Sequence, residues 1–216
     1  MPASNQLRVV TDILMIVFVM LFPHYGRLPM YAFPFVVLGV IWIYLNLTGE
    51  NFDSIGFRFR DLNARSFWLG GTMGLLYAAF AYWVLGPFIT HKLGFKNLNF
   101  SDFDYIRHHT WNYILLVLIA VFLVIPFEEI AFRGFIFNRV KDIFKSKWPF
   151  LVSGIITSIL FALYHYQEGI GAMLGIFIFA LFITWLYKIF KGNLWYLIFF
   201  HIMYDVFFLT AIWLGH

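Results

Sequence analysis

The chain has 216 residues, of which 62% are hydrophobic, 23% aromatic and only 12% charged, and its formal net charge is +4. A soluble domain is typically about 45–50% apolar and about 25% charged, and a water-soluble fold of this length could not bury so much apolar surface. The small positive charge falls in expected loops, so nucleic-acid binding is not indicated. Cysteine is absent, which excludes disulfides and thiolate metal sites.

Apolar segments of membrane-spanning length recur along the whole chain. A hydrocarbon core about 30 Å thick requires roughly 20 apolar residues per helix. The pattern therefore predicts an all-α polytopic transmembrane helix bundle with about seven spans, within a range of six to eight, and residues 1–216 form a single integral membrane domain. The spans are expected at about 8–22, 31–47, 66–89, 111–127, 149–165, 170–190 and 193–214.

The first of these segments is the weakest candidate. It carries Asp12 and ends at Pro23, so its apolar part is short, and an interfacial position is the alternative to a spanning one. Arg8 lies four residues before Asp12, and we expect the two to pair near the headgroups. The fourth span has an uncertain end, because residues 128–140 either extend it or form a separate short helix.

The distribution of Lys and Arg between the two sides predicts the orientation. Cytoplasmic loops of membrane proteins carry an excess of these residues. Ten against four places the N-terminus in the cytoplasm, which fits a prokaryotic cytoplasmic membrane. The ten are Arg8, Arg58, Arg60, Arg65, Arg139, Lys141, Lys145, Lys147, Lys188 and Lys191, and the four are Arg27, Lys92, Lys96 and Arg107.

Small residues one helical turn apart occur in two expected spans. Gly70 and Gly74 form one such pair, and Gly171 and Gly175 form the other. Glycine at this spacing lets membrane helices approach each other closely. We therefore expect helix–helix contacts at both pairs.

Three short motifs place six ionisable side chains inside otherwise apolar segments. A charge near the bilayer centre costs about 2.5–3.5 kcal/mol on insertion scales, so such residues usually face a polar interior and mark function. Acids, imidazoles and one guanidinium converging from separate helices indicate a hydrolytic site within the membrane. The six residues are Glu128, Glu129, Arg133, His165, His201 and Asp205.

Helical spacing assigns a face to each residue of the first two motifs. Glu129 and Arg133 lie four residues apart and can pair, which makes them structural support. Glu128 lies about 100° around the helix from Glu129 and is expected to point elsewhere, towards a cavity. Phe161 lies one turn before His165, where it either wedges the ring or lines a substrate groove.

These residue types suit hydrolysis by an activated water. A desolvated carboxylate can act as a general base near neutral pH, so Glu128 with His165 is expected to hold and deprotonate a water that attacks a peptide carbonyl. His201 is expected to donate to the developing oxyanion. Asp205 shares a helical face with His201 and is expected to orient it through a ring N–H.

The same side chains allow a metal-dependent alternative. Glu128, His165 and His201 resemble a catalytic zinc set of two histidines and one glutamate with one open position. Such sites normally show tighter local spacing, as in H-E-x-x-H, which this sequence lacks. Metal-free water activation, which requires no cofactor, is therefore favoured, and a divalent metal such as zinc is the alternative.

The order E-E-x-x-x-R, F-x-x-x-H and H-x-x-x-D on successive apolar helices resembles the CPBP family, the CAAX-protease and bacteriocin-processing (Abi) group of intramembrane endopeptidases. The resemblance covers about residues 111–210 and implies a CPBP-like catalytic core there. It implies that Glu128 is the water-activating base, assisted by His165. It also implies that His201 and Asp205 stabilise the oxyanion.

Asp205 departs from the pattern of the eukaryotic CAAX proteases, which carry Asn at this position. Asn can donate a hydrogen bond to an oxyanion, whereas ionised Asp cannot. Asp205 is therefore expected to be protonated, to orient His201 or to ligate a metal. Many prokaryotic members resemble this chain in using Asp.

The resemblance implies a membrane-embedded or membrane-anchored protein or peptide as substrate and the lipid bilayer as surroundings. The cavity is expected to open towards the cytoplasmic leaflet, because the first motif adjoins the basic 139–147 loop. One rival is a non-catalytic membrane partner, immunity or regulatory protein, and the other is a proton-coupled transporter. The remaining histidines are expected to be solvated: His24, His91, His108, His109 and His216.

Overall fold

A computed structural model describes residues 3–25, 28–29, 31–95, 100–144 and 146–215. Within these ranges the chain forms helices, turns and loops and contains no strand, which confirms the all-α class. Four residues named above lie outside the described residues, three of them from the orientation count: Arg27, Lys96, Lys145 and His216.

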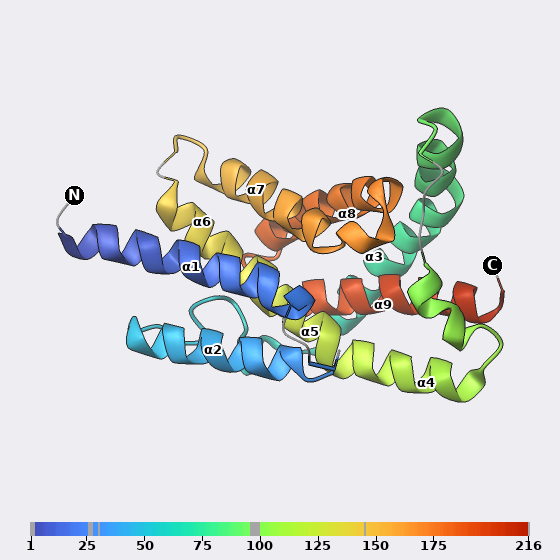
Figure 1. Ribbon diagram of the computed structural model, residues 1–216, viewed down its shortest axis with the longest axis horizontal. Helices are drawn as coiled ribbons and strands as arrows, with labels where there is room; N and C mark the ends of the chain where they lie inside the picture. Colours follow the sequence, from blue (N-terminus) through green and yellow to red (C-terminus); the bar gives the residue numbers. More distant parts are fainter. Residues whose placement is uncertain (1–2, 26–27, 30, 96–99, 145, 216) are drawn as a thin grey trace.

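The helices are joined by turns and loops, including the longer segment 48–63 between α2 and α3 (Figure 1). In Figure 1, α9 runs through the middle, with α7 and α8 above it and α2 and α4 below. The bounds are α1 Ala3–Tyr25, α2 Phe33–Leu47, α3 Ala64–Phe80, α4 Thr110–Ile119, α5 Ile125–Glu128, α6 Phe137–Ile143, α7 Pro149–Tyr164, α8 Ile170–Ile189 and α9 Leu194–Trp213.

Among the described residues, five helical stretches are long and apolar enough to cross a membrane, so the protein is an integral membrane protein. The expectation of about seven spans is confirmed in part, because α2 and α7 are apolar but have only 15 and 16 residues. A 16-residue helix is about 24 Å long, short of a hydrocarbon core about 30 Å thick. The five stretches are Gln6–Tyr25, Ala64–Lys92, Thr110–Ile143, Ile170–Ile189 and Leu194–Trp213.

The first motif extends the fourth span. One helical stretch, Thr110–Ile143, carries α4, α5 and α6 and widens to π geometry at Ala120–Val124 and again at Glu129–Ile136. Pro126 lies between the two wide segments and lacks the N–H that an α-helical turn would use. Every residue of Glu129–Ile136 is buried, so the motif lies inside the bundle. Wide π turns often occur at functional sites.

Close contact between α3 and α9 confirms the expectation for the first glycine pair. A Cβ atom added at Gly70 would overlap the carbonyl oxygen of Tyr196, and one added at Gly74 would overlap the backbone of Phe200. Only glycine permits this approach of two backbones. In α8, a Cβ atom added at Gly175 would lie 3.6 Å from the side chain of Ile89, an ordinary contact, so glycine is not required there.

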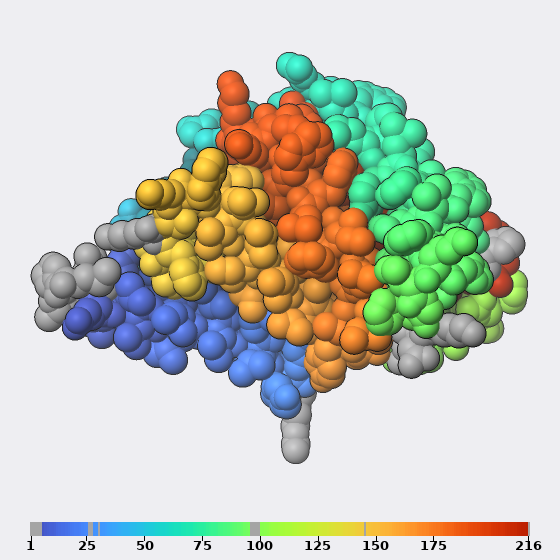
Figure 2. All heavy atoms as spheres, turned by 90° about the horizontal axis from the view of Figure 1, so that it is seen from above, coloured from blue at the N-terminus to red at the C-terminus, as the bar shows by residue number. Residues whose placement is uncertain are grey.

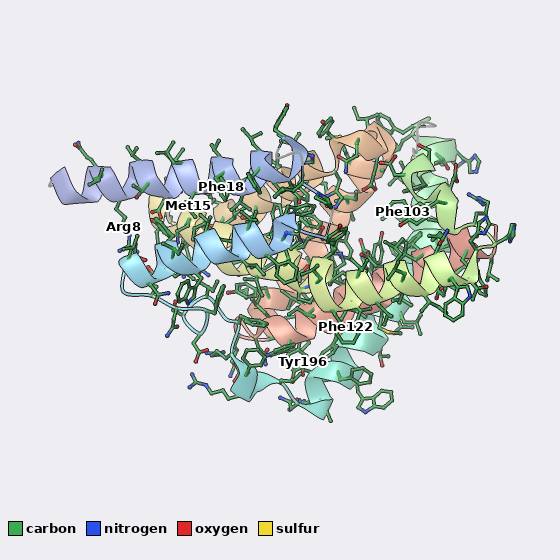
Figure 3. All side chains as sticks on the ribbon, turned by 60° about the horizontal axis from the view of Figure 1, so that its bottom comes forward. Arg8, Met15, Phe18, Phe103, Phe122 and Tyr196 are labelled. Carbon is green, nitrogen blue, oxygen red and sulfur yellow. The ribbon has the colours of Figure 1, made fainter. Side chains whose placement is uncertain are left out.

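A charged cluster joins α1 and α2 to the end of α6. Glu50, just beyond α2, accepts hydrogen bonds from Arg8 at 2.7 Å and from Arg139 at 2.5 Å. Figure 3 labels Arg8, which points from α1 towards the end of α2. Asp12 is buried and accepts from Tyr44 at 2.5 Å. The expected Arg8–Asp12 pair is therefore wrong, because both side chains find partners on other elements.

Candidate active site

The closest polar contact in the site joins the first and third motifs. The Nδ1 atom of His201 on α9 lies 2.7 Å from Oε1 of Glu129. Both side chains are almost fully buried, at 5% and 0% exposed. Because Glu129 receives this contact, it helps to fix the orientation of the imidazole.

Arg133 contacts the same carboxylate oxygen of Glu129 as His201 does. Its Nη1 atom lies 3.4 Å from Oε1 of Glu129, so the predicted pair one turn apart is present. The guanidinium also lies 4.1 Å above the ring of Phe161, a cation–π contact. Arg133 is 1% exposed, and a buried charge requires such partners.

Glu128 lies between the two imidazoles. Its Oε1 atom is 3.9 Å from Nε2 of His165, and its Oε2 atom is 3.8 Å from Nε2 of His201. The two adjacent glutamates both reach His201, Glu129 at Nδ1 and Glu128 at Nε2, and only Glu128 also lies near His165. The carboxylate has one oxygen directed to each ring.

His165 caps the end of α7, and its orientation is set by the preceding turn. Its Nδ1 atom lies 2.9 Å from the carbonyl oxygen of Phe161, which can only accept a hydrogen bond. The Nδ1–H group therefore donates to that carbonyl, and in the neutral ring Nε2 presents a lone pair towards Glu128. Phe161 also packs against the imidazole, with ring centroids 4.8 Å apart, so it acts as the expected wedge.

Asp205 lies on the other side of His201 from Glu129. Its Oδ1 atom is 3.5 Å from Nε2 of His201, the nitrogen that also faces Glu128. The nitrogen that a carboxylate engages at 2.7 Å is Nδ1, and its partner is Glu129. Asp205 therefore lies beside the ring as expected, and Glu129 makes a second, shorter contact that the local i, i+4 spacing on α9 could not reveal.

Of the three expected zinc ligands, the two imidazoles lie on either side of the Glu128 carboxylate, at distances too long for shared metal ligands. Among the described residues, no group of three His, Asp or Glu side chains is arranged to hold an ion. Glu128 lies 3.9 and 3.8 Å from the Nε2 atoms of His165 and His201, and His201 uses its other nitrogen for Glu129. A zinc ion would require these side chains to move closer together around it.

The accessible side of the site lies towards the turn after α7. Asp205 is the most exposed member at 33%, and His165 follows at 17%. The Glu168 carboxyl, in the turn Tyr166–Glu168, interacts electrostatically with Asp205 and Asp102. This region lies at the opposite end of α7 from Pro149, so the site does not open towards the basic 139–147 loop as expected. The first motif adjoins that loop in sequence, but the helix from Glu128 to its end is roughly 20 Å long.

Two aromatic contacts near the site could not be predicted from the sequence. The ring of Phe179 on α8 lies 4.9 Å from that of His201, but Phe179 is one apolar residue among many in its helix. His24, expected to be solvated, is half-buried, with its ring 4.9 Å from Tyr164 and 5.4 Å from Tyr166. The end of α1 thus covers part of the turn that follows His165.

The fold and the site together define an integral membrane protein with a buried cluster of carboxylates and imidazoles. Residues 110–207 match the family model of the Rce1-like proteins, described as type II CAAX prenyl endopeptidases. The match confirms the family resemblance carried by the three motifs, and it spans all of the candidate site residues. No curated protein and no solved structure matches the chain.

Proposed function

We propose that this protein is an intramembrane endopeptidase that hydrolyses a peptide bond of a membrane-embedded or membrane-anchored protein or peptide. One observation carries the proposal: the buried carboxylate of Glu128 lies within 4 Å of the Nε2 atoms of both His165 and His201. The match to a family of prenyl endopeptidases supports a peptidase rather than another hydrolase.

The gap between Glu128 and His165 suits a bound water. Two acceptors that share one water, each at a hydrogen-bond distance of about 2.8 Å, lie about 4.5 Å apart when the hydrogen bonds are near-linear. The observed separation of 3.9 Å is shorter than this, so a small outward movement of either side chain would let one water donate to the Glu128 carboxylate and to the His165 lone pair. Glu128 accepts a proton as the water oxygen attacks the peptide carbonyl carbon.

His201 is the proposed donor to the oxyanion. Both of its nitrogens face carboxylate oxygens, so the ring is placed to carry a proton on each. The Nδ1–H group donates to Glu129, and the Nε2–H group is directed towards the reacting carbonyl. When the tetrahedral intermediate collapses, the C–N bond breaks, and the amine takes the proton that Glu128 received.

Asp205 has a supporting part in this proposal. An ionised carboxylate cannot donate to an oxyanion, but at 3.5 Å from Nε2 it can help to hold the proton on His201. Asp205 is the most exposed side chain of the site, so it also borders the path by which a substrate enters. Lipid-embedded substrates would approach between the helices.

The test uses purified full-length protein in nanodiscs with two fluorogenic membrane peptides, one with a farnesylated CAAX tail and one with a transmembrane anchor. We expect cleavage by wild-type protein and by the surface control Asp53→Asn, and at least a 100-fold loss in Glu128→Gln and His165→Ala. Thermal unfolding confirms that the variants fold. Wild-type rates in both folded active-site variants would overturn the proposal.

Metal-dependent hydrolysis is the competing mechanism for the same residues. Under the metal-free mechanism, dialysis against a chelator leaves the cleavage rate unchanged. Under the zinc mechanism, the rate falls on chelation, returns on addition of zinc, and follows the zinc content of the sample.

A non-catalytic partner or immunity protein is the second candidate function. Its prediction is distinct, because binding to a membrane partner would survive Glu128→Gln. Copurification of the variant with an undiminished biological effect would favour this role over peptidase activity.

A further inference from the structure

A groove on the face opposite α2 and α4 takes no part in the proposed chemistry. It lies between the beginning of α7 and the end of α8 and has a volume of about 430 Å³. Figure 2 looks onto this face, where α7 and α8 lie side by side. The residues that matter for the argument are Lys147, Trp148, Leu151, Ile155, Trp185 and Lys188, all of which line it.

Two lysines supply positive charge at one end of the groove. Lys147 precedes α7, and Lys188 lies in the last turn of α8. The two lysines therefore come from different elements of the fold and line the same groove. The ion pairs found among the described residues pair neither lysine with an acid. The Nζ atom of Lys188 lies 5.4 Å from the ring centre of Phe150, which leaves the ammonium able to bind an anion.

The remainder of the groove is apolar and faces outward. Leu151 is 58% exposed and Trp185 is 52% exposed, and Ile155 continues the apolar surface one turn further along α7. Trp148 stands beside the lysines, and tryptophan is enriched at the level of the lipid headgroups. The lysines would face the phosphate of a phospholipid, and the apolar part of the groove would face one of its acyl chains.

We propose that this groove binds an anionic phospholipid. The lipid phosphate lies between Lys147 and Lys188, and one acyl chain follows Leu151 and Ile155 along α7. Basic pockets between transmembrane helices bind anionic headgroups in this way. The site lies at the end of α7 opposite His165, so the inference does not depend on the proposed peptidase activity.

Charge and position favour a lipid over a partner helix. A transmembrane partner would gain little from two ammonium groups at the groove's end, whereas a phosphate pairs with both. The groove also borders the short helix α7, whose 16 residues are about 24 Å long, less than the thickness of the hydrocarbon core. A lipid bound at its first turn would fix the depth of α7 in the bilayer.

The test compares lipid binding by full-length protein in detergent, using native mass spectrometry with phosphatidylglycerol and phosphatidylcholine. The variant is Lys147→Gln/Lys188→Gln. The matched control, Lys141→Gln/Lys191→Gln, removes two charges from the same end of the molecule, and its residues do not line the groove.

We expect wild-type protein to retain phosphatidylglycerol at least fivefold better than phosphatidylcholine. The preference should be lost in the groove variant and kept in the control. Equal retention of the two lipids by wild-type protein, or an unchanged preference in the folded groove variant, would overturn the proposal. Displacement of phosphatidylglycerol by millimolar inorganic phosphate would also overturn it, because a free anion would then be the ligand.

Discussion

The Nδ1 atom of His201 lies 2.7 Å from Oε1 of Glu129, although 72 positions separate them in the sequence. The same oxygen receives Arg133 at 3.4 Å. The second glutamate of the first motif is therefore linked to both the buried cation and the imidazole. In the proposed mechanism it is a positioning residue, since it acts on the reacting atoms through His201.

Replacement of Glu129 by Gln should reduce kcat by about 10–100-fold with little change in KM, because the ring loses the carboxylate that orients it. Turnover of the fluorogenic membrane peptide measures both constants. The single variant also leaves Arg133 buried without its anion, which is destabilising.

The double variant Glu129→Gln/Arg133→Met separates orientation from folding. It removes both buried charges, so we expect its thermal stability to exceed that of Glu129→Gln while its kcat stays low. Wild-type kcat in the double variant would show that His201 does not need Glu129.

Substitution of Gly74 by Ala should destabilise the protein strongly, because the added Cβ overlaps the backbone of Phe200 and separates α3 from α9. The matched control is Gly39→Ala, where a Cβ meets nothing within 4 Å and alanine favours the helix. Thermal unfolding in detergent should show a lower Tm for the first variant and an unchanged or higher Tm for the second. Equal Tm values would contradict the close contact.

The Glu168 carboxyl should make stability depend on pH. Burial, followed by the negative charges of Asp205 and Asp102, raises the pKa of Glu168 to about 7. Between about pH 4.5 and 7 the folded state therefore keeps a proton on Glu168 that the unfolded state has released. Because the folded state binds more protons in this range, the free energy of unfolding falls as the pH rises from about 4.5 through 7.

The variant Glu168→Gln has no carboxyl to ionise, so its Tm should match that of wild-type protein at pH 4.5 and exceed it at pH 8. Differential scanning fluorimetry at the two pH values provides the measurement. A Tm difference that is the same at both pH values would mean that Glu168 does not titrate in this range.

Single-cysteine labelling should place the exposed side of the site opposite the basic loops. The natural chain contains no cysteine, so each introduced thiol reports one position. With the N-terminus in the cytoplasm, we expect a membrane-impermeant maleimide to label Glu168→Cys in intact cells and Lys147→Cys only after permeabilisation. The reverse pattern would invert the orientation inferred from the charge count.

Hydropathy located most of the long apolar helices, and residue type and spacing located the polar motifs within them. A run such as 170–190 is apolar throughout, and helix Ile170–Ile189 follows that pattern closely. The i, i+4 spacing also predicted the Glu129–Arg133 pair, because both residues lie on one helix.

Contacts between elements were beyond the same reasoning. Local spacing suggested that Arg8 pairs with Asp12, but Glu50 lies close to Arg8 only because α1 packs beside α2. Spacing on α9 suggested that Asp205 contacts His201, but it gave no sign that packing of the fourth span against α9 also places Glu129 at Nδ1. Tertiary packing decides which of several acids reaches a given base.

The most direct measurement is cleavage of the membrane-anchored peptide in water enriched in oxygen-18, followed by mass spectrometry of the new C-terminus. Our account predicts one oxygen-18 atom in the newly formed carboxylate and at least 100-fold less of this product with Glu128→Gln than with Asp53→Asn. Product formed at the wild-type rate by folded Glu128→Gln, or product without the heavy oxygen, would contradict a water activated by Glu128.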